Sequence, residues 1–186
     1  MRLAKPQPEL RIETERLTLR PIIEGDLDDL VAKINDYDIA RMTARIPHPY
    51  GPADARTYLA LQQAARRRSD AVRLTIDHDG RLIGGISLFS MPYRSELGYW
   101  LGRASWGHGF ATEAGRALLA YGFDALNLAL IHCLVALDNP ASGRVQRKLG
   151  FRRIGFAVGR SLARGADVEH IHSILTPGHF RAVNLR

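Results

Sequence analysis

Two glycines just ahead of an expected helix form the most informative pattern in the sequence. Gly107 and Gly109 lie in the segment from Trp106 to Ala114, which is typical of a glycine loop that opens onto a helix. Such a loop leaves backbone N–H groups free at the positively polarised helix end, which suits a phosphate group. The pattern predicts a phosphorylated cofactor that is held by backbone atoms.

The residues expected to surround the phosphates are consecutive. They are Trp106, Gly107, His108, Gly109, Phe110, Ala111 and Thr112. We expect His108 to contribute its backbone alone. Taken by themselves, the two glycines more often mark a tight turn at a helix start, so the prediction needs support from the rest of the chain.

A second polar segment follows an apolar run further along the chain. Asn139 stands directly before Pro140, at the expected start of a helix. It either caps that helix or hydrogen-bonds an amide of the cofactor. Arg144 and Lys148 are four residues apart and share a helix face. They could reach a phosphate of the cofactor, although a solvated basic face is the plainer interpretation.

The elements that position these segments alternate between strands and helices. Periodicity predicts strands over residues 10–22, 71–77, 81–89, 95–103, 130–137, 151–159 and 167–175. It predicts helices over residues 25–35, 110–126 and 140–149 and a further helix after Pro52, with 36–50 irregular. Antiparallel strands come first and a βαβ-type crossover follows.

Composition places the chain among ordinary globular proteins. Its 186 residues, 46 % hydrophobic and 24 % charged, predict one domain over 1–186, with residues 1–8 loose. No membrane span or signal peptide is apparent, and the single cysteine, Cys133, lies in an apolar run. We therefore expect a buried thiol, no contact with a membrane and a cytoplasmic location.

The net charge of +7 comes almost entirely from arginine and favours acidic partners such as a nucleotide cofactor, or RNA. The run from Arg66 to Arg68 has no aromatic neighbours, so this pattern disfavours a nucleic-acid-binding module. His170 and His172 lack a third nearby ligand, so no metal site is expected. Thr112 occupies the third glycine position of a Rossmann motif, and neither a P-loop nor a nucleophile elbow occurs.

Five motifs in order carry a family resemblance. They are Ile12–Pro21 (IETERLTLRP), Glu96–Leu101 (ELGYWL), Trp106–Ala114 (WGHGFATEA), Asn139–Ser142 (NPAS) and Lys148–Phe151 (KLGF). On these motifs the chain resembles the GNAT N-acetyltransferase superfamily, and within it the RimJ/RimL-like branch, over about residues 10–180. The chain departs from the family loop pattern at Ala104, with Arg103 one residue earlier.

The resemblance implies an α/β fold of the α+β type. It implies a mixed, mostly antiparallel central sheet of about seven strands, with about four helices on both faces. A splayed pair of strands would hold acetyl-CoA, whose pantetheine arm would lie along Glu96–Arg103 as an added strand. Leu101 would offer a backbone N–H to the reacting carbonyl oxygen, and Arg103 would contact the cofactor.

The implied reaction is transfer of an acetyl group from acetyl-CoA to a primary amine, by direct attack in a ternary complex. Glu96 is the candidate base, with an exposed strand charge as its alternative role. Ser142 is the candidate acid for the leaving thiolate, although serine is also common in a first helical turn. Many relatives use tyrosine for this step, and no tyrosine stands near Ser142 in the sequence.

The acceptor is either a protein N-terminus or a small-molecule amine, and a homodimer is compatible with the resemblance. We expect residues 36–50, the helix after Pro52 and the last hairpin to form the acceptor site. A non-catalytic acyl-CoA sensor and an RNA- or ribosome-associated binding module are the alternative functions. The sensor would keep the glycine loop but lack an acid and a base.

Overall fold

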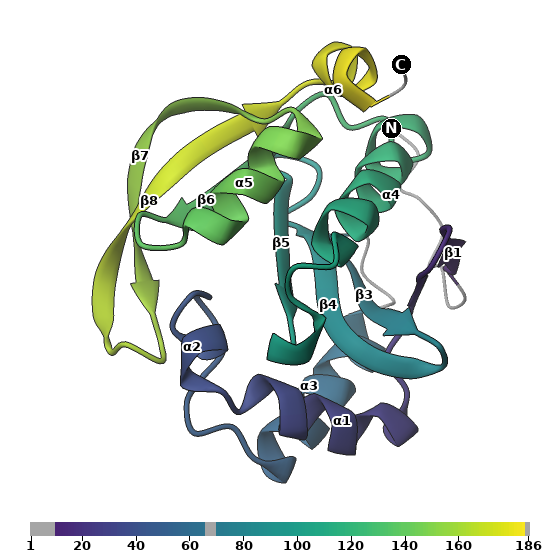
Figure 1. The fold of residues 1–186 in the computed structure, drawn as a ribbon, viewed down its shortest axis with the longest axis vertical. Helices are drawn as coiled ribbons and strands as arrows, with labels where there is room; N and C mark the ends of the chain where they lie inside the picture. Colours follow the sequence, from purple (N-terminus) through teal and green to yellow (C-terminus); the bar gives the residue numbers. More distant parts are fainter. Residues whose placement is uncertain (1–9, 66–69, 185–186) are drawn as a thin grey trace.

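The computed structural model describes residues 10–65 and 70–184, and there eight strands form one mixed sheet (Figure 1). Residues 1–8 and the run from Arg66 to Arg68 lie outside the described residues. The strand order is β1-β2-β3-β4-β5-β6-β8-β7, and only the β5–β6 pair among them is parallel. The strands are β1 (Ile12–Glu13), β2 (Thr18–Arg20), β3 (Val72–His78), β4 (Arg81–Phe89), β5 (Glu96–Leu101), β6 (Ile131–Ala136), β7 (Arg152–Ser161) and β8 (Ala166–Leu175).

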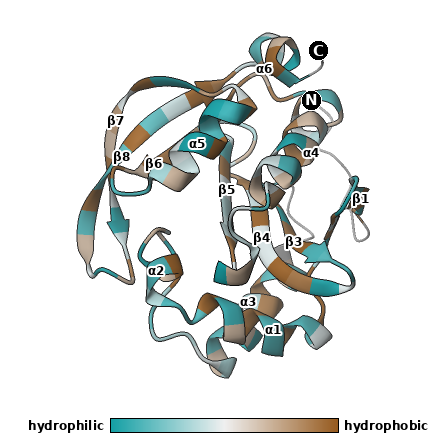
Figure 2. Cartoon of the chain, viewed as in Figure 1, coloured by the Kyte–Doolittle hydropathy of each residue, from teal (hydrophilic) through white to brown (hydrophobic). Residues whose placement is uncertain are grey.

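Helices cover both faces of this sheet and bury two separate cores. One core lies under α4 and α5 and includes Leu88, Leu97 and Cys133. The other packs α1 and α3 against Leu82 and Trp100 on the opposite face. Figure 2 shows strongly hydrophobic stretches along β4, which separates the two cores. The helices are α1 (Leu27–Ile34), α2 (Tyr37–Ala40), α3 (Pro52–Ala65), α4 (Phe110–Asp124), α5 (Pro140–Leu149) and α6 (Pro177–Asn184).

This architecture confirms the predicted mixed, mostly antiparallel sheet with helices on both faces. It has one strand and two helices more than expected. The prediction of one strand over residues 10–22 was wrong, because a turn at Thr14 divides it into β1 and β2. The Thr14 amide donates to the carbonyl of Leu17, and the Thr14 hydroxyl accepts from the Leu17 amide, which fixes that turn.

The parallel pair of strands in the middle of the sheet separates almost at once. Only Glu96 and His132 are in register between β5 and β6, and the amide of His132 donates to the carbonyl of Ser95 at 2.8 Å. Beyond this point the two strands diverge toward Leu101 and Ala136. The splayed pair predicted from the resemblance is therefore present.

The buried thiol was also predicted correctly. Cys133 lies in the larger core, where burial raises the pKa of its thiol to about 12. Such a thiol is inert at neutral pH. None of the helices in residues 10–65 and 70–184 is both long and apolar enough to cross a membrane.

Candidate active site

The glycine loop adopts the backbone conformation that its sequence predicts. Gly107 and Gly109 have φ angles of +81° and +83°, in the left-handed region that favours glycine. Within the described residues, the amides of residues 107 to 111 donate no hydrogen bond. Five consecutive N–H groups at the start of α4 are thus free for an anion. The amides at each end are engaged, since Trp106 donates to Arg103 and Thr112 donates to Gly109.

Side chains from distant segments hold this loop in place. The indole N–H of Trp106 donates to the carbonyl of Leu101 at 2.8 Å, which fastens the loop to the end of β5. Arg16 donates to the His108 carbonyl, and its guanidinium lies 4.7 Å from the centre of the Phe110 ring. The loop is therefore braced from β5 and from the turn before β2.

Glu113 connects the first turn of α4 to the N-terminal hairpin. Its Oε1 accepts from the Thr14 hydroxyl at 2.6 Å and from the Arg16 amide, and its Oε2 pairs with the Arg16 guanidinium at 2.6 Å. Burial opposes the charge of Glu113, but these hydrogen bonds outweigh it and lower the pKa of the carboxyl. We did not predict this brace, although its residues stand in the first and third motifs of the resemblance.

The edge of β5 that faces β6 offers backbone groups to a ligand. The amide of Gly102 donates to Ile83 of β4, whereas the carbonyl of Ser95 faces β6. Because successive residues of a strand point their backbone groups to opposite sides, Tyr99 and Leu101 direct their amides into the splay. This geometry is what an added strand-like ligand requires.

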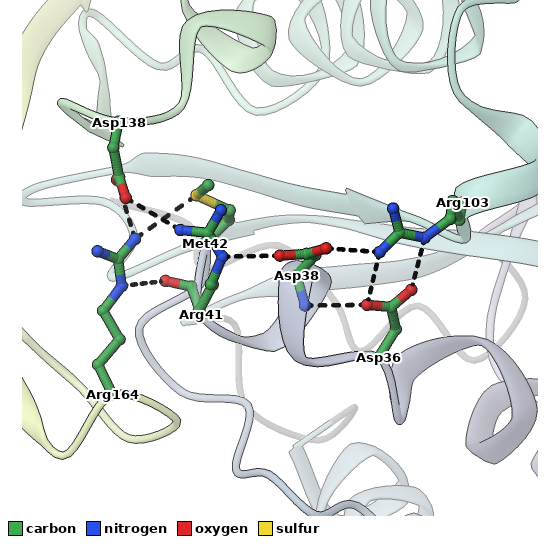
Figure 3. A network of polar contacts seen from close by, with 7 residues as sticks. All are labelled: Asp36, Asp38, Arg41, Met42, Arg103, Asp138 and Arg164. Carbon is green, nitrogen blue, oxygen red and sulfur yellow. Dashed lines mark hydrogen bonds and ion pairs between the residues drawn. The ribbon is translucent and has the colours of Figure 1, made fainter.

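Arg103 lies at the end of β5 and belongs to a network of ion pairs (Figure 3). Its guanidinium donates to both oxygens of Asp36, at 2.9 and 3.0 Å, and to Asp38 at 2.7 Å. The pKa of Asp36 is lowered chiefly by the hydrogen bond from Arg103. Arg103 is predicted to contact the cofactor. It would have to do so while its guanidinium is bound to two carboxylates.

The same network continues from α2 across the open end of the splay (Figure 3). Arg41 pairs with Asp38 and with Asp138, which follows β6. Arg164, in the turn between β7 and β8, pairs with Asp138 and donates to the carbonyl of Arg41. The α2 segment thus joins the ends of both splayed strands to the last hairpin, within the region expected to form the acceptor site.

The start of α5 lies against β5. The side chain of Asn139 accepts from the amide of Ser142 at 3.0 Å, so Asn139 caps the helix. The hydroxyl of Tyr99 lies 3.4 Å from the Ser142 carbonyl, and burial raises the pKa of that phenol. No tyrosine stands near Ser142 in the sequence, but β5 brings Tyr99 there from a distant part of the chain. Arg144 and Lys148 are exposed on α5.

Glu96 lies where β5 and β6 begin to separate, on the face opposite α4. Within the described residues its carboxylate has no hydrogen bond or ion pair. Burial raises its pKa, and the charges of Arg45 and Arg94 oppose this rise. A carboxylate with a raised pKa next to a splayed strand is suited to taking up a proton.

Two histidines lie beside Glu96 on the same face of the sheet. His132 is its register partner, and Nδ1 of His132 lies 2.8 Å from Nε2 of His172 on β8. Burial, together with His172 and Arg94, lowers the pKa of His132. In the described part of the chain no three histidine, cysteine or acidic side chains are grouped to hold a metal ion.

Comparison with known proteins agrees with this geometry. Residues 16–152 match the family model described as the Acetyltransferase (GNAT) domain. The chain is 33 % identical over 163 residues to the uncharacterized N-acetyltransferase p20 of Bacillus licheniformis, covering 84 % of this chain and 90 % of that protein. RimJ of Mycobacterium smegmatis, solved with CoA-disulfide, has a TM-score of 0.80 at 19 % identity, over 93 % of this chain and 88 % of that chain.

A second solved structure shows the same fold. The microcin C7 self-immunity acetyltransferase MccE, solved with acetyl-CoA and AMP, has a TM-score of 0.79 at 18 % identity, over 88 % of this chain and 93 % of that chain. The chain therefore belongs to the GNAT acetyltransferase family. It is an acetyl-CoA-dependent N-acetyltransferase, and the free amides of residues 107 to 111 fit the phosphates of that cosubstrate.

Proposed function

We propose that this acetyltransferase acts on a primary amine, at a protein N-terminus or on a small molecule, by direct attack in a ternary complex. The observation that carries the proposal is the row of five unbonded amides at residues 107 to 111, next to the diverging edge of β5. Glu96 lies at the other end of the same edge. A single cosubstrate can thus be held from its phosphates to its acetyl group, with a base at the reacting end.

In this proposal, backbone amides bind the cosubstrate, and side chains add a smaller number of contacts. Gly107, His108, Gly109, Phe110 and Ala111 donate their amides to the diphosphate. Acetyl-CoA supplies the acetyl thioester. A backbone amide near Leu101 that faces the splay, between the phosphate end and Glu96, stabilises negative charge on the reacting carbonyl oxygen. The remaining predicted contacts come from Arg103, Trp106, Thr112, Asn139, Arg144 and Lys148.

Glu96 acts as the general base. The attacking amine must lose a proton to form an amide, and a carboxylate with a raised pKa accepts protons better than an ordinary exposed glutamate. The lack of a protein partner supports this role, because a structural carboxylate at this depth is normally paired. Glu96 takes the proton directly or through a water.

Ser142 acts as the general acid that protonates the leaving thiolate. It lies in the first turn of α5, beside the diverging edge of β5. Tyr99 is a second candidate for the same step, supported by its approach to Ser142 and by a pKa that burial keeps above its ordinary value. A phenol in that environment stays protonated at neutral pH, as an acid must.

We also propose that the chain works as a single domain in the cytoplasm and as a homodimer. The outermost strand of the described sheet, β7, supports the assembly, since it presents Ile154, Phe156 and Val158 with 55 %, 58 % and 68 % of their surfaces exposed. An unpaired sheet edge with an apolar row is suited to pairing with another chain. Light scattering on the purified protein tests the assembly.

The activity is tested with purified protein, acetyl-CoA and a panel of amines, by detecting free thiol as it is released. We expect calorimetry to show saturable binding of acetyl-CoA, and at least one amine to be acetylated. Binding without turnover of any amine would instead support the acyl-CoA sensor. No binding of acetyl-CoA would contradict the proposal.

A further inference from the structure

A cluster of charged and polar side chains surrounds Glu96 on the acceptor side of the sheet. Register places Phe89 of β4 and His132 of β6 on either side of Glu96. Their sequence neighbours Leu88, Leu97 and Cys133 are buried under α4 and α5. Because successive side chains of a strand alternate between faces, the cluster lies on the opposite face.

Two arginines flank this cluster. The Arg45 guanidinium lies 4.7 Å from the centre of the Phe89 ring, and Phe89 is the cross-strand neighbour of Glu96. Arg94 precedes Glu96 by two residues, and its positive charge acts on Glu96, His132 and His172. Both arginines are exposed, so a ligand can reach them.

Neither arginine has a carboxylate partner in the described part of the chain, in contrast to three other arginines near the splay. Arg41, Arg103 and Arg164 each form an ion pair with an aspartate. Among the described residues, Arg45 and Arg94 form none. The guanidinium groups nearest the candidate base are thus available to bind an anion.

The histidines add no fixed charge to the cluster. His132 and His172 approach each other at 2.8 Å through ring nitrogens, so one nitrogen donates and the other accepts. Two charged imidazolium rings cannot make that contact, and the pKa values of both histidines are lowered. The ionisable groups that remain in the cluster are therefore the carboxyl of Glu96 and the two guanidinium groups.

We propose that this cluster is the acceptor site and that it selects an amine whose own molecule carries a carboxylate or phosphate group. The inference rests on the proposed function, since it assigns the second substrate of the same reaction. Glu96 receives the ammonium end and then its proton, while Arg45 and Arg94 hold the anionic end. A polyamine places further positive charges next to the two guanidinium groups and is disfavoured.

The test compares acceptors that differ only in the anion. Initial rates of thiol release are measured for α-amino acids against their carboxamides, with spermidine as a polycation. A second arm uses short peptides with Asp or Glu near a free N-terminus against their Asn or Gln counterparts, which separates a small-molecule acceptor from a protein N-terminus. We expect at least one anionic amine to exceed its uncharged partner by about tenfold or more in kcat/KM, which corresponds to about 1.4 kcal/mol.

Variants assign this preference to the two arginines. The double substitution Arg45→Gln/Arg94→Gln should lower kcat/KM for the anionic amine at least tenfold and leave its uncharged partner within threefold. Arg116→Gln is the matched control, because Arg116 is exposed on α4, on the other face of the sheet, and also has no carboxylate partner among the described residues. We expect that variant to match the wild type. The affinity for acetyl-CoA should be the same in all three proteins.

The outcomes separate this inference from the proposed function. Equal or better turnover of uncharged amines or spermidine overturns the anionic acceptor and leaves the acetyltransferase in place. The anionic acceptor is also overturned if the double variant loses kcat/KM equally for an anionic amine and for its uncharged partner. If acetyl-CoA binds and no anionic amine in either arm is acetylated, the inference fails. Failure to bind acetyl-CoA counts against the proposed function instead.

Discussion

The two ends of the diverging edge of β5 are built in different ways. At the glycine loop, backbone amides with left-handed glycines form the proposed phosphate site, and one braced carboxylate, Glu113, holds the loop. At the Glu96 end, the groups that face a ligand are side chains from β4, β5, β6, β8 and the loop after α2. A backbone site depends on local conformation, whereas a side-chain site depends on distant segments that meet.

This difference has a functional counterpart. The cosubstrate is common to the family, so its site can be made from atoms that every residue possesses. The acceptor differs among relatives, and a site made of side chains can change by single substitutions. The comparison therefore predicts that substitutions at the two ends affect different steps, and the predictions below separate them.

The largest effect is expected from Glu96→Gln, which removes the base and preserves size. We expect kcat/KM for the acceptor to fall by about 10²–10⁴-fold, the usual contribution of a general base, with acetyl-CoA affinity unchanged. Burial raises the pKa of Glu96, so wild-type activity should fall as pH decreases through that raised value, where the base becomes protonated. The variant should lack that limb of the pH profile. A kcat/KM within threefold of the wild type would remove Glu96 as the base.

At the other end, Gly109→Val should weaken acetyl-CoA binding by about 10–100-fold, because a branched side chain in the left-handed region costs about 1–2 kcal/mol and tilts the amides of the loop. Gly80→Val is the matched control. Gly80 has a φ of +78° in the hairpin between β3 and β4 and open space around it, and a Cβ added at Gly109 would meet Arg16 only at ordinary contact distance, 3.6 Å. Calorimetry should show the control binding like the wild type. Equal losses in both variants would point to general instability.

The sequence was sufficient to predict the backbone end. The spacing of Gly107 and Gly109 before an amphipathic helix specifies the loop locally, and the splay was predicted from the family resemblance. It was insufficient at the side-chain end. His132 and His172 are forty residues apart and meet only because β6 pairs with β8. Tyr99 and Ser142 are also far apart in the sequence, and only the folded chain brings them together.

Short or locally irregular elements were missed for a related reason. The helix α2 has four residues and ends in ion pairs with Arg103 and Asp138, so tertiary contacts stabilise it rather than its own propensity. The strand expected over residues 10–22 has the right alternation, yet a side-chain-stabilised turn at Thr14 interrupts it. Periodicity detects burial on one face and gives no signal for either feature.

A third prediction concerns the acid, which lies between the two ends. If Ser142 protonates the thiolate, Ser142→Ala should lower kcat about tenfold or more, and Tyr99→Phe should have little effect. The reverse order would transfer the role to Tyr99. Stopped-flow measurement of thiol release distinguishes the chemical step from binding. If neither variant changes kcat by more than threefold, neither residue is the acid.

A smaller effect is expected from Glu113→Gln, which keeps the shape of the brace and removes its charge. The loss of the ion pair with Arg16 should reduce acetyl-CoA affinity only several-fold, because hydrogen bonds from Thr14 and the Arg16 amide can persist. The acceptor KM should not change. A change in acceptor KM with unaltered acetyl-CoA affinity would contradict the separation of the two ends.

The smallest effect is expected from Asp36→Asn/Asp38→Asn, which cuts the network between α2 and Arg103 (Figure 3). Exposed ion pairs contribute little, so the melting temperature should fall only slightly at neutral pH. The pKa values of both aspartates are lowered chiefly by Arg103, so their stabilising contribution is present above the ordinary aspartate pKa. It is lost as pH falls through the depressed values, where wild type and variant should converge.

Acceptor KM should change more than stability in this variant, because α2 joins the ends of the splayed strands to the last hairpin. Asp124→Asn is the control, since Asp124 at the end of α4 forms an exposed ion pair with Arg181 of α6. Thermal melts at several pH values, together with acceptor titrations, provide both readouts. A large drop in melting temperature without a change in acceptor KM would show that the network maintains the fold. The side-chain end would then be as firmly held as the glycine loop, and the contrast between the two ends would be lost.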